Sequence, residues 1–216
     1  MRHEASRAVL LVSVLFGGVA VADSAEPSTN RENRSQGIPA RCQIYTQIPA
    51  DARESGMAWN QLLSFAACVE DTSAVVGTSD DIEQLVENMA HALAPSLALY
   101  LQAIQKEPAP VQIRAAYHVG MAYLGLVTRA RASITAPHDL KNEKAMAEYR
   151  DKHAKLEKLL APALKACRMT FVVIVAAVKQ DPSIATDPMT RDIVLKAAEM
   201  IKLLPELPDD EPENWT

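Results

Sequence analysis

The sequence predicts an all-α fold of roughly five to seven helices, arranged as an antiparallel helical bundle or α-hairpin array behind a signal peptide. Apolar residues recur every three or four positions through most of the chain, which is the spacing of one face of a helix. Glycine is scarce, at 7 of 216 residues, and aromatic residues make up 5%. Alanine and leucine, which favour helices, are abundant. Proline-containing breaks separate the periodic stretches.

Residues 1–22 have the three parts of a secretory signal peptide. Arg2 and Arg7 supply positive charge, an apolar run follows over residues 8–16, and small residues lead to Ala22. This apolar stretch is shorter than the roughly 18 residues that a membrane span needs. We therefore expect cleavage after Ala22, a secreted or periplasmic product, and no membrane span in the mature chain.

The distribution of apolar residues divides the rest of the chain into three segments. Residues 23–41 are polar and lack a periodic apolar face, which is typical of a disordered linker. Residues 42–204 contain the periodic stretches and are predicted to form a single all-helical domain. Residues 205–216 are acidic and proline-rich, and are predicted to be a disordered tail.

The first two predicted helices lie in the N-terminal half of this domain. The first begins near Ser55. The second is capped by Asp80, with Glu83 three residues later in a capping-box pattern. Its apolar stripe continues to Lys106, and Pro95 marks either a kink or a junction between two helices.

The third predicted helix runs from Pro110 to about Ser133 and is apolar over most of its circumference. A helix of this kind is expected at the centre of the fold. Gly120, Ala122 and Gly125 lie along it, and their small size would let neighbouring backbones approach closely.

The most regular pattern is a heptad-like apolar seam over residues 146–178. Pro162 lies within it, so a bend or a junction is expected there. Residues 171–178 are rich in β-branched side chains, as a buried strand would be, but the seam continues through them in phase and favours a helix. Asp187 and Pro188 are predicted to cap and open the last helix.

The chain contains three cysteines, an odd number for an exported protein. Their spacing matches no zinc or c-type haem motif. Because Cys167 falls on the apolar seam, a Cys42–Cys68 disulfide is favoured, and three reduced core cysteines are the alternative. Such a bridge would stabilise the fold by about 3 to 4 kcal/mol in the chain-entropy model.

One group of residues could bind a metal ion. Glu83, Glu87 and His91 follow one another at four-residue intervals, which places them on one side of a helix. They flank the apolar stripe, so a solvated helix edge is the alternative interpretation. No HExxH, P-loop, GxGxxG or GxSxG motif is in the sequence, and no cofactor is predicted.

A second group, Arg114, Tyr117 and His118, lies on the predicted central helix and could line a polar pocket for a ligand or partner. Ordinary packing of the helix surface explains the same residues. If the protein were an enzyme or a small-molecule binder, His91, Arg114 and His118 would have to converge in one enclosed pocket.

Two further candidates are a single histidine and a pair of arginines. His153 occupies a position in the apolar seam, where it is either a pH-responsive buried histidine or a half-exposed one. Arg129 and Arg131 lie near the end of the third predicted helix. They either complement the helix dipole or bind an anion.

Residues 116–123, together with Ala132, resemble the first-helix pattern of the tetratricopeptide repeat. In that family a small residue and a glycine pack against the partner helix, and a later alanine closes the pair. The match covers about half a repeat, residues 59–66 repeat it more faintly, and no period of about 34 residues is visible. The resemblance implies an array of α-hairpins.

Together these observations favour a non-enzymatic exported protein that binds a protein or peptide partner in a groove between hairpins. The net charge of −5 gives no basis for a general affinity for nucleic acid. Two alternatives stay open. One is a small-molecule or metal binder, or an enzyme, with a site built from the second and third helices. The other is a structural component of the cell envelope.

Overall fold

The computed structural model describes Cys42, residues 63–64 and 66–68, and residues 81–206. Every regular element in this part of the chain is helical, and it contains no strand, so the all-α prediction is confirmed. The predicted signal peptide, the linker, the start of the first predicted helix and most of the tail lie outside the described residues.

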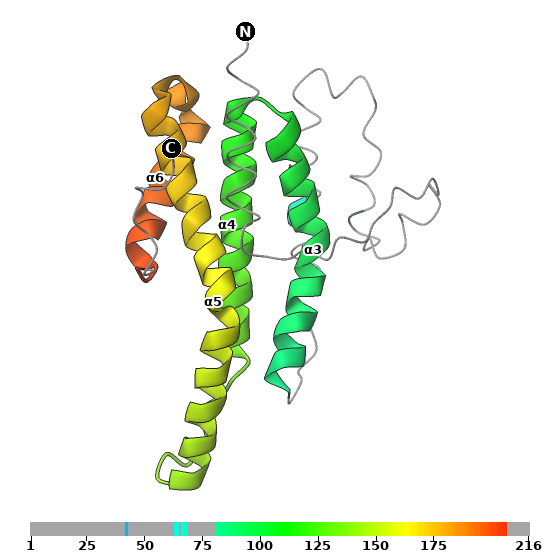
Figure 1. Ribbon diagram of the computed structural model, residues 1–216, viewed down its shortest axis with the longest axis vertical. Coiled ribbons are helices and arrows are strands. Elements are labelled where there is room, and N and C mark those ends of the chain that lie inside the picture. Colours follow the sequence, from blue (N-terminus) through cyan, green and yellow to red (C-terminus); the bar gives the residue numbers. More distant parts are fainter. Residues whose placement is uncertain (1–41, 43–62, 65, 69–80, 207–216) are drawn as a thin grey trace, which may run out of the picture.

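Consecutive helices run in opposite directions (Figure 1). α4 lies between α3 and α5, and α6 packs along the C-terminal half of α5 (Figure 1). A short 3-10 helix connects α5 to α6. The elements are α3 (Ile82–Lys106), α4 (Ala109–Ala132), α5 (Glu143–Gln180), the 3-10 helix η4 (Pro182–Thr186) and α6 (Pro188–Leu203).

The start of α3 corrects the predicted cap by one residue. Asp81, not Asp80, is the N-cap, and its Oδ1 accepts a hydrogen bond from the backbone N–H of Glu83 at 2.9 Å. Glu83 is therefore the second residue of the helix and not the third, where a capping box needs it. Asp80 and Asp81 carry the same carboxylate acceptor. With Asp81 as the cap, the helix begins at Ile82, and Ile82 and Leu85 lie in the core.

Both internal prolines lie within continuous helices, so the alternative of two helices meeting at Pro95 or Pro162 is wrong. A proline removes the hydrogen bond to the carbonyl four residues earlier. Pro95 and Pro162 are exposed, as are His91 and Lys158, the residues that carry those carbonyls. The lost bonds therefore lie on the solvent side of each helix, where the cost is low.

The core lies where α4 meets its neighbours, as predicted for a central helix. α5 contributes eight buried residues to the fold, and the predicted strand-like run is helical. Most of the α5 seam from Leu156 onward is buried, with Ala163 and Val178 partly buried, whereas Met146, Tyr149 and His153 include no buried residue. These three residues lie in the first turns of α5, which project past the ends of α3 and α4 (Figure 1).

Small residues on α4 have different roles. An ideal Cβ atom on Gly120 would lie 2.7 Å from Cε1 of Phe171, so the glycine makes room for an aromatic ring of α5. Ala122 is fully buried. At Gly125 the nearest atom to such a Cβ is Nη1 of Arg129, on the same helix, at 3.2 Å. The prediction of a close helix approach at Gly125 is therefore wrong.

Both ends of α6 are held by polar side chains. Oδ2 of Asp187 accepts hydrogen bonds from the backbone N–H and the hydroxyl of Thr190, at 3.0 and 2.7 Å, which confirms Asp187 as the cap. At the other end, the buried Arg168 of α5 donates from Nη1 to the carbonyls of Ile201 and Leu204, at 2.7 and 3.1 Å. These carbonyls have no partner within α6 itself.

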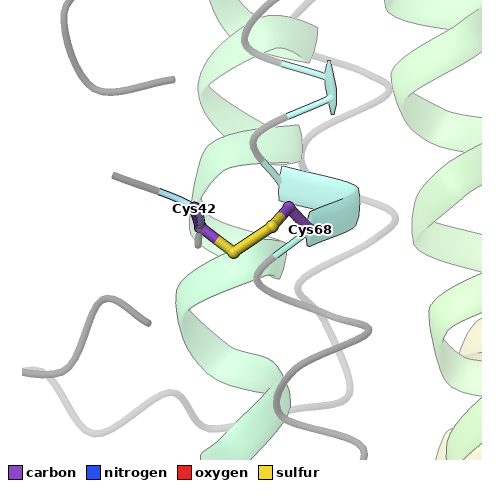
Figure 2. The surroundings of a disulfide bond; sticks show 2 residues. All are labelled: Cys42 and Cys68. Atoms are coloured by element: carbon purple, nitrogen blue, oxygen red, sulfur yellow. A yellow bond between two sulfur atoms is a disulfide. The ribbon is translucent and has the colours of Figure 1, made fainter. Parts of the chain in front are cut away.

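Cys42 and Cys68 form a disulfide (Figure 2), as predicted, and Cys167 is free and buried. The bridge closes a sequence separation of 26 residues. It attaches Cys42 to the helical stretch that includes Leu63 and Ala67. Burial raises the pKa of the Cys167 thiol to about 12, so it stays protonated and unreactive at neutral pH.

By length and composition, α5 is the one helix in the described part of the chain that could cross a membrane. Much of its apolar half packs against α4 and α6 instead. Arg168, a cation that binds the end of α6, also lies in this half. A charge in the middle of a membrane span is costly.

Candidate functional site

A cavity of about 270 Å³ lies between the first turns of α4, the first turns of α6 and the helical stretch after residue 62. It is more open than enclosed, and most of its wall is apolar. We call it the α4–α6 pocket. Its lining residues are Leu63, Ser64, Ala67, Arg114, His118, Met189 and Ile193.

The lining follows from helical spacing. Arg114 and His118 are four residues apart on α4, and Met189 and Ile193 are four residues apart on α6. Residues at this interval lie one above the other on the same helix face. Each wall of the pocket is therefore one helix face, and two candidates from the sequence, Arg114 and His118, meet in it.

His118 has a fixed ring orientation. Its imidazole stacks on the buried Tyr100 of α3, with ring centroids 5.3 Å apart and planes inclined by 9°. Burial lowers the pKa of His118 from its ordinary value, so the ring is neutral at neutral pH. None of the described residues forms a hydrogen bond with either ring nitrogen of His118. A neutral imidazole offers one donor and one acceptor to a ligand.

Arg114 connects the two helices of the pocket. Its side chain is 19% exposed, and its Nε donates to the carbonyl of Pro110 at 3.3 Å. Nη1 lies 3.5 Å from the sulfur of Met189, and Nη2 lies 3.7 Å from Oδ2 of Asp187. Hydrogen bonds from Thr190, followed by smaller effects that include Arg114, lower the pKa of Asp187. The aspartate is thus ionised and occupied by the first turn of α6.

Tyr117 does not line the pocket, although the sequence grouped it with Arg114 and His118. Its ring packs against Phe171, with centroids 5.7 Å apart, and meets His118 edge-on at 6.3 Å. Tyr117 therefore packs behind the pocket lining and not in it. Successive side chains on a helix point about 100° apart, so Tyr117 and His118 lie on different faces of α4.

The three residues of the predicted metal site, Glu83, Glu87 and His91, do not form a metal site. Glu83 forms an ion pair with Lys155 of α5 at 3.0 Å, and His91 lies 3.8 Å from Glu87. All three candidates are exposed, and His91 is not among the residues that line the pocket. Among the described residues, no group of three or more His, Cys, Asp or Glu side chains could hold a metal ion.

The two remaining sequence candidates have local partners. Arg131 donates to both carboxylate oxygens of Glu157, at 2.8 and 2.7 Å, so a carboxylate of the chain already occupies this candidate anion site. The hydrogen bond raises the pKa of Arg131 and lowers that of Glu157. His153 has a side chain that is 42% exposed, which agrees with the half-exposed alternative.

Five of the pocket's lining residues, from two of its three walls, were not among the sequence candidates. Leu63, Ser64 and Ala67 come from a different stretch of chain, and Met189 has the pattern of a surface residue. Ile193 is on the inner stripe of the last helix but has no motif around it. The one signal in the sequence for these lining residues is their spacing of four positions. This spacing shows that they share a helix face, but it does not show which helix faces pack together.

Comparison of the chain with protein-family models, curated proteins and solved structures found no match. The tetratricopeptide resemblance therefore has no support from a family model. The helix lengths also differ, because α5 alone has 38 residues and a whole repeat has about 34.

Proposed function

We propose that this chain is an exported, non-enzymatic helical protein, built as an antiparallel bundle, that binds a protein or peptide partner. In this proposal the α4–α6 pocket anchors the partner. The observation that carries it is the placement of Arg114 and His118 inside a cavity whose other walls are mostly apolar. Well-packed pockets with a few polar groups are where binding energy concentrates in protein interfaces.

The size of the pocket supports a partner that inserts one group. Its volume of about 270 Å³ is below the roughly 300 to 1,000 Å³ of typical small-molecule sites. One side chain or one chain end fills such a space, and the rest of a polypeptide would lie on the surface around it.

The Cys42–Cys68 disulfide supports export. Disulfides persist in oxidising compartments and are rare in the cytosol. Together with the signal-peptide pattern of residues 1–22, the disulfide favours a secreted or periplasmic location. Mass spectrometry of the protein from its native envelope fraction would test this, with Asp23 expected as the first residue.

The alternative of a small-molecule binder retains part of its basis. Arg114 and His118 share the pocket, but His91 is exposed and lies beside Glu87. Two of the three residues that this alternative requires are therefore together. It would be favoured if a small molecule alone saturated the pocket.

Site-directed photocrosslinking tests the proposed function. A photoreactive amino acid replaces Met189 in the pocket or, as the matched control, Leu203, which is 76% exposed on the same helix. In the native envelope, the Met189 position should yield a covalent adduct with a discrete polypeptide that the Leu203 position does not yield. Identical adducts from both positions would contradict the proposal.

A further inference from the structure

We propose that the α4–α6 pocket binds the free C-terminal carboxylate of its partner polypeptide, together with an apolar last side chain. This inference rests on the proposed function and specifies which part of the partner enters the pocket. It follows from one cation, one neutral imidazole and an apolar floor that share a cavity large enough for a chain end.

The cation comes from Arg114, the one charged residue among the described residues that line the pocket. A guanidinium has five N–H donors in a planar fork. Nε is bonded to the carbonyl of Pro110, and among the described residues the hydrogen-bond partner of Nη1 is the sulfur of Met189, which is a weak acceptor. A carboxylate accepts two parallel hydrogen bonds from such a fork, so it would replace a weak contact with a strong one.

Asp187 forms an ion pair with Arg114, but the two side chains are too far apart for a hydrogen bond. Its Oδ2 is 3.7 Å from Nη2 of Arg114, beyond hydrogen-bonding distance, and the same oxygen accepts two hydrogen bonds from Thr190. Asp187 is also not among the residues that line the pocket.

His118 lies one helical turn from Arg114 and is held by its stack on Tyr100. Its neutral ring can donate to the second carboxylate oxygen or accept from the backbone N–H of the partner's last residue. Because the ring is already oriented, little entropy is lost when the partner binds.

The apolar part of the ligand has a matching surface. Leu63, Met189 and Ile193 line the pocket beside the two polar groups. Met189 is 57% exposed, and an unbranched methionine adapts to different side chains. An aliphatic last residue would cover these three side chains while its carboxylate reaches Arg114.

The test uses two synthetic peptide libraries with random upstream residues and a C-terminal leucine. One library ends in a free carboxylate and the other in an amide. Binding to the mature, disulfide-bonded chain is measured by fluorescence anisotropy. We expect the carboxylate library to bind at least about tenfold more tightly, as for one charge-assisted hydrogen bond. Equal affinity for the two libraries would overturn the inference.

Variants assign the difference to the pocket. Arg114→Gln should lower the affinity of the carboxylate library to that of the amide library. Arg114→Lys retains the positive charge but loses the planar fork, so its preference for the carboxylate library should be intermediate. This variant also tests the inference if Arg114→Gln does not fold. Arg191→Gln, on the exposed face of α6, is the matched control and should bind as the wild type does. A carboxylate preference that survives both Arg114 substitutions would overturn the assignment.

A competition with free 4-methylpentanoate separates a peptide end from a small acid. It should displace the peptides only weakly, because it lacks the backbone of the last residue. If it binds as tightly as the peptides, a free acid is the ligand and the inference is overturned. An adduct at Met189 without a carboxylate preference would leave the proposed function standing while this inference fails.

Discussion

Gly120 of α4 lies against the ring of Phe171 of α5, so closely that an added Cβ would stand 2.7 Å from Cε1 and 2.8 Å from Cζ. Phe171 is fully buried and also packs against Tyr117, so a shift of its ring would disturb the core. The glycine therefore sets the distance between the two most extensively packed helices of the fold.

Gly120→Ala should destabilise the protein by about 1 to 3 kcal/mol, because overpacking at Phe171 outweighs the gain in helix propensity. Gly125→Ala is the matched control. Its Cβ would meet only the flexible end of Arg129, so we expect up to about 1 kcal/mol of stabilisation. Urea unfolding of both variants measures the change in the free energy of unfolding. If Gly120→Ala stabilised the protein, the ring of Phe171 would have to move aside at little cost, which would contradict the prediction.

Arg168→Ala should cost about 2 to 4 kcal/mol, because it removes this donor from the partly buried carbonyl of Ile201 and the buried carbonyl of Leu204. Arg191→Ala removes an exposed arginine of α6 and should change stability by less than about 0.5 kcal/mol. Hydrogen exchange should show that the last turn of α6 opens first in the Arg168 variant. Equal exchange in both variants would refute the role of Arg168 as a cap.

Reduction of the Cys42–Cys68 bridge should lower stability by about 3 to 4 kcal/mol, from the chain entropy of its 26-residue separation. Thermal unfolding with and without dithiothreitol measures the loss. Cys167→Ala should retain the full response to reductant because Cys167 is free, whereas the double variant Cys42→Ser/Cys68→Ser should have none. If the double variant still responds, the assigned pairing is wrong.

His118 should make stability depend on pH. Its folded pKa lies below the ordinary value of 6.5 because burial disfavours the charged ring. Below about pH 6.5 the unfolded chain therefore binds more protons than the folded one. Stability should be complete above that pH and should decline as the pH falls toward the folded pKa of His118.

His118→Gln should flatten this decline in chemical unfolding measured between about pH 8 and about pH 5. A slope that persists in the His118 variant would assign the titration to another group.

Much of the helical architecture follows from the sequence. The seam of α5, the cap at Asp187 and Pro110, which lies in the first turn of α4 one residue after its start, predicted three helices close to their observed bounds. The disulfide followed from the position of Cys167 on the seam. These inferences succeed because they rest on local spacing and on burial of one helix face.

Other features depend on which side of a helix faces which neighbour. Asp80 and Asp81 are chemically equal as caps, and only the burial of Ile82 and Leu85 distinguishes them. Gly120 and Gly125 look alike in the sequence, yet only Gly120 meets Phe171. The pocket combines faces from three separate stretches, so a single helix pattern does not reveal it.

The position of the disulfide also bears on timing. Cys68 directly follows Ala67, so one wall of the α4–α6 pocket is tethered by a bond that reducing conditions prevent. In the reduced chain this wall would be held by noncovalent contacts alone. If the protein is exported and binds its partner as proposed, the pocket would be complete only after the bridge has formed.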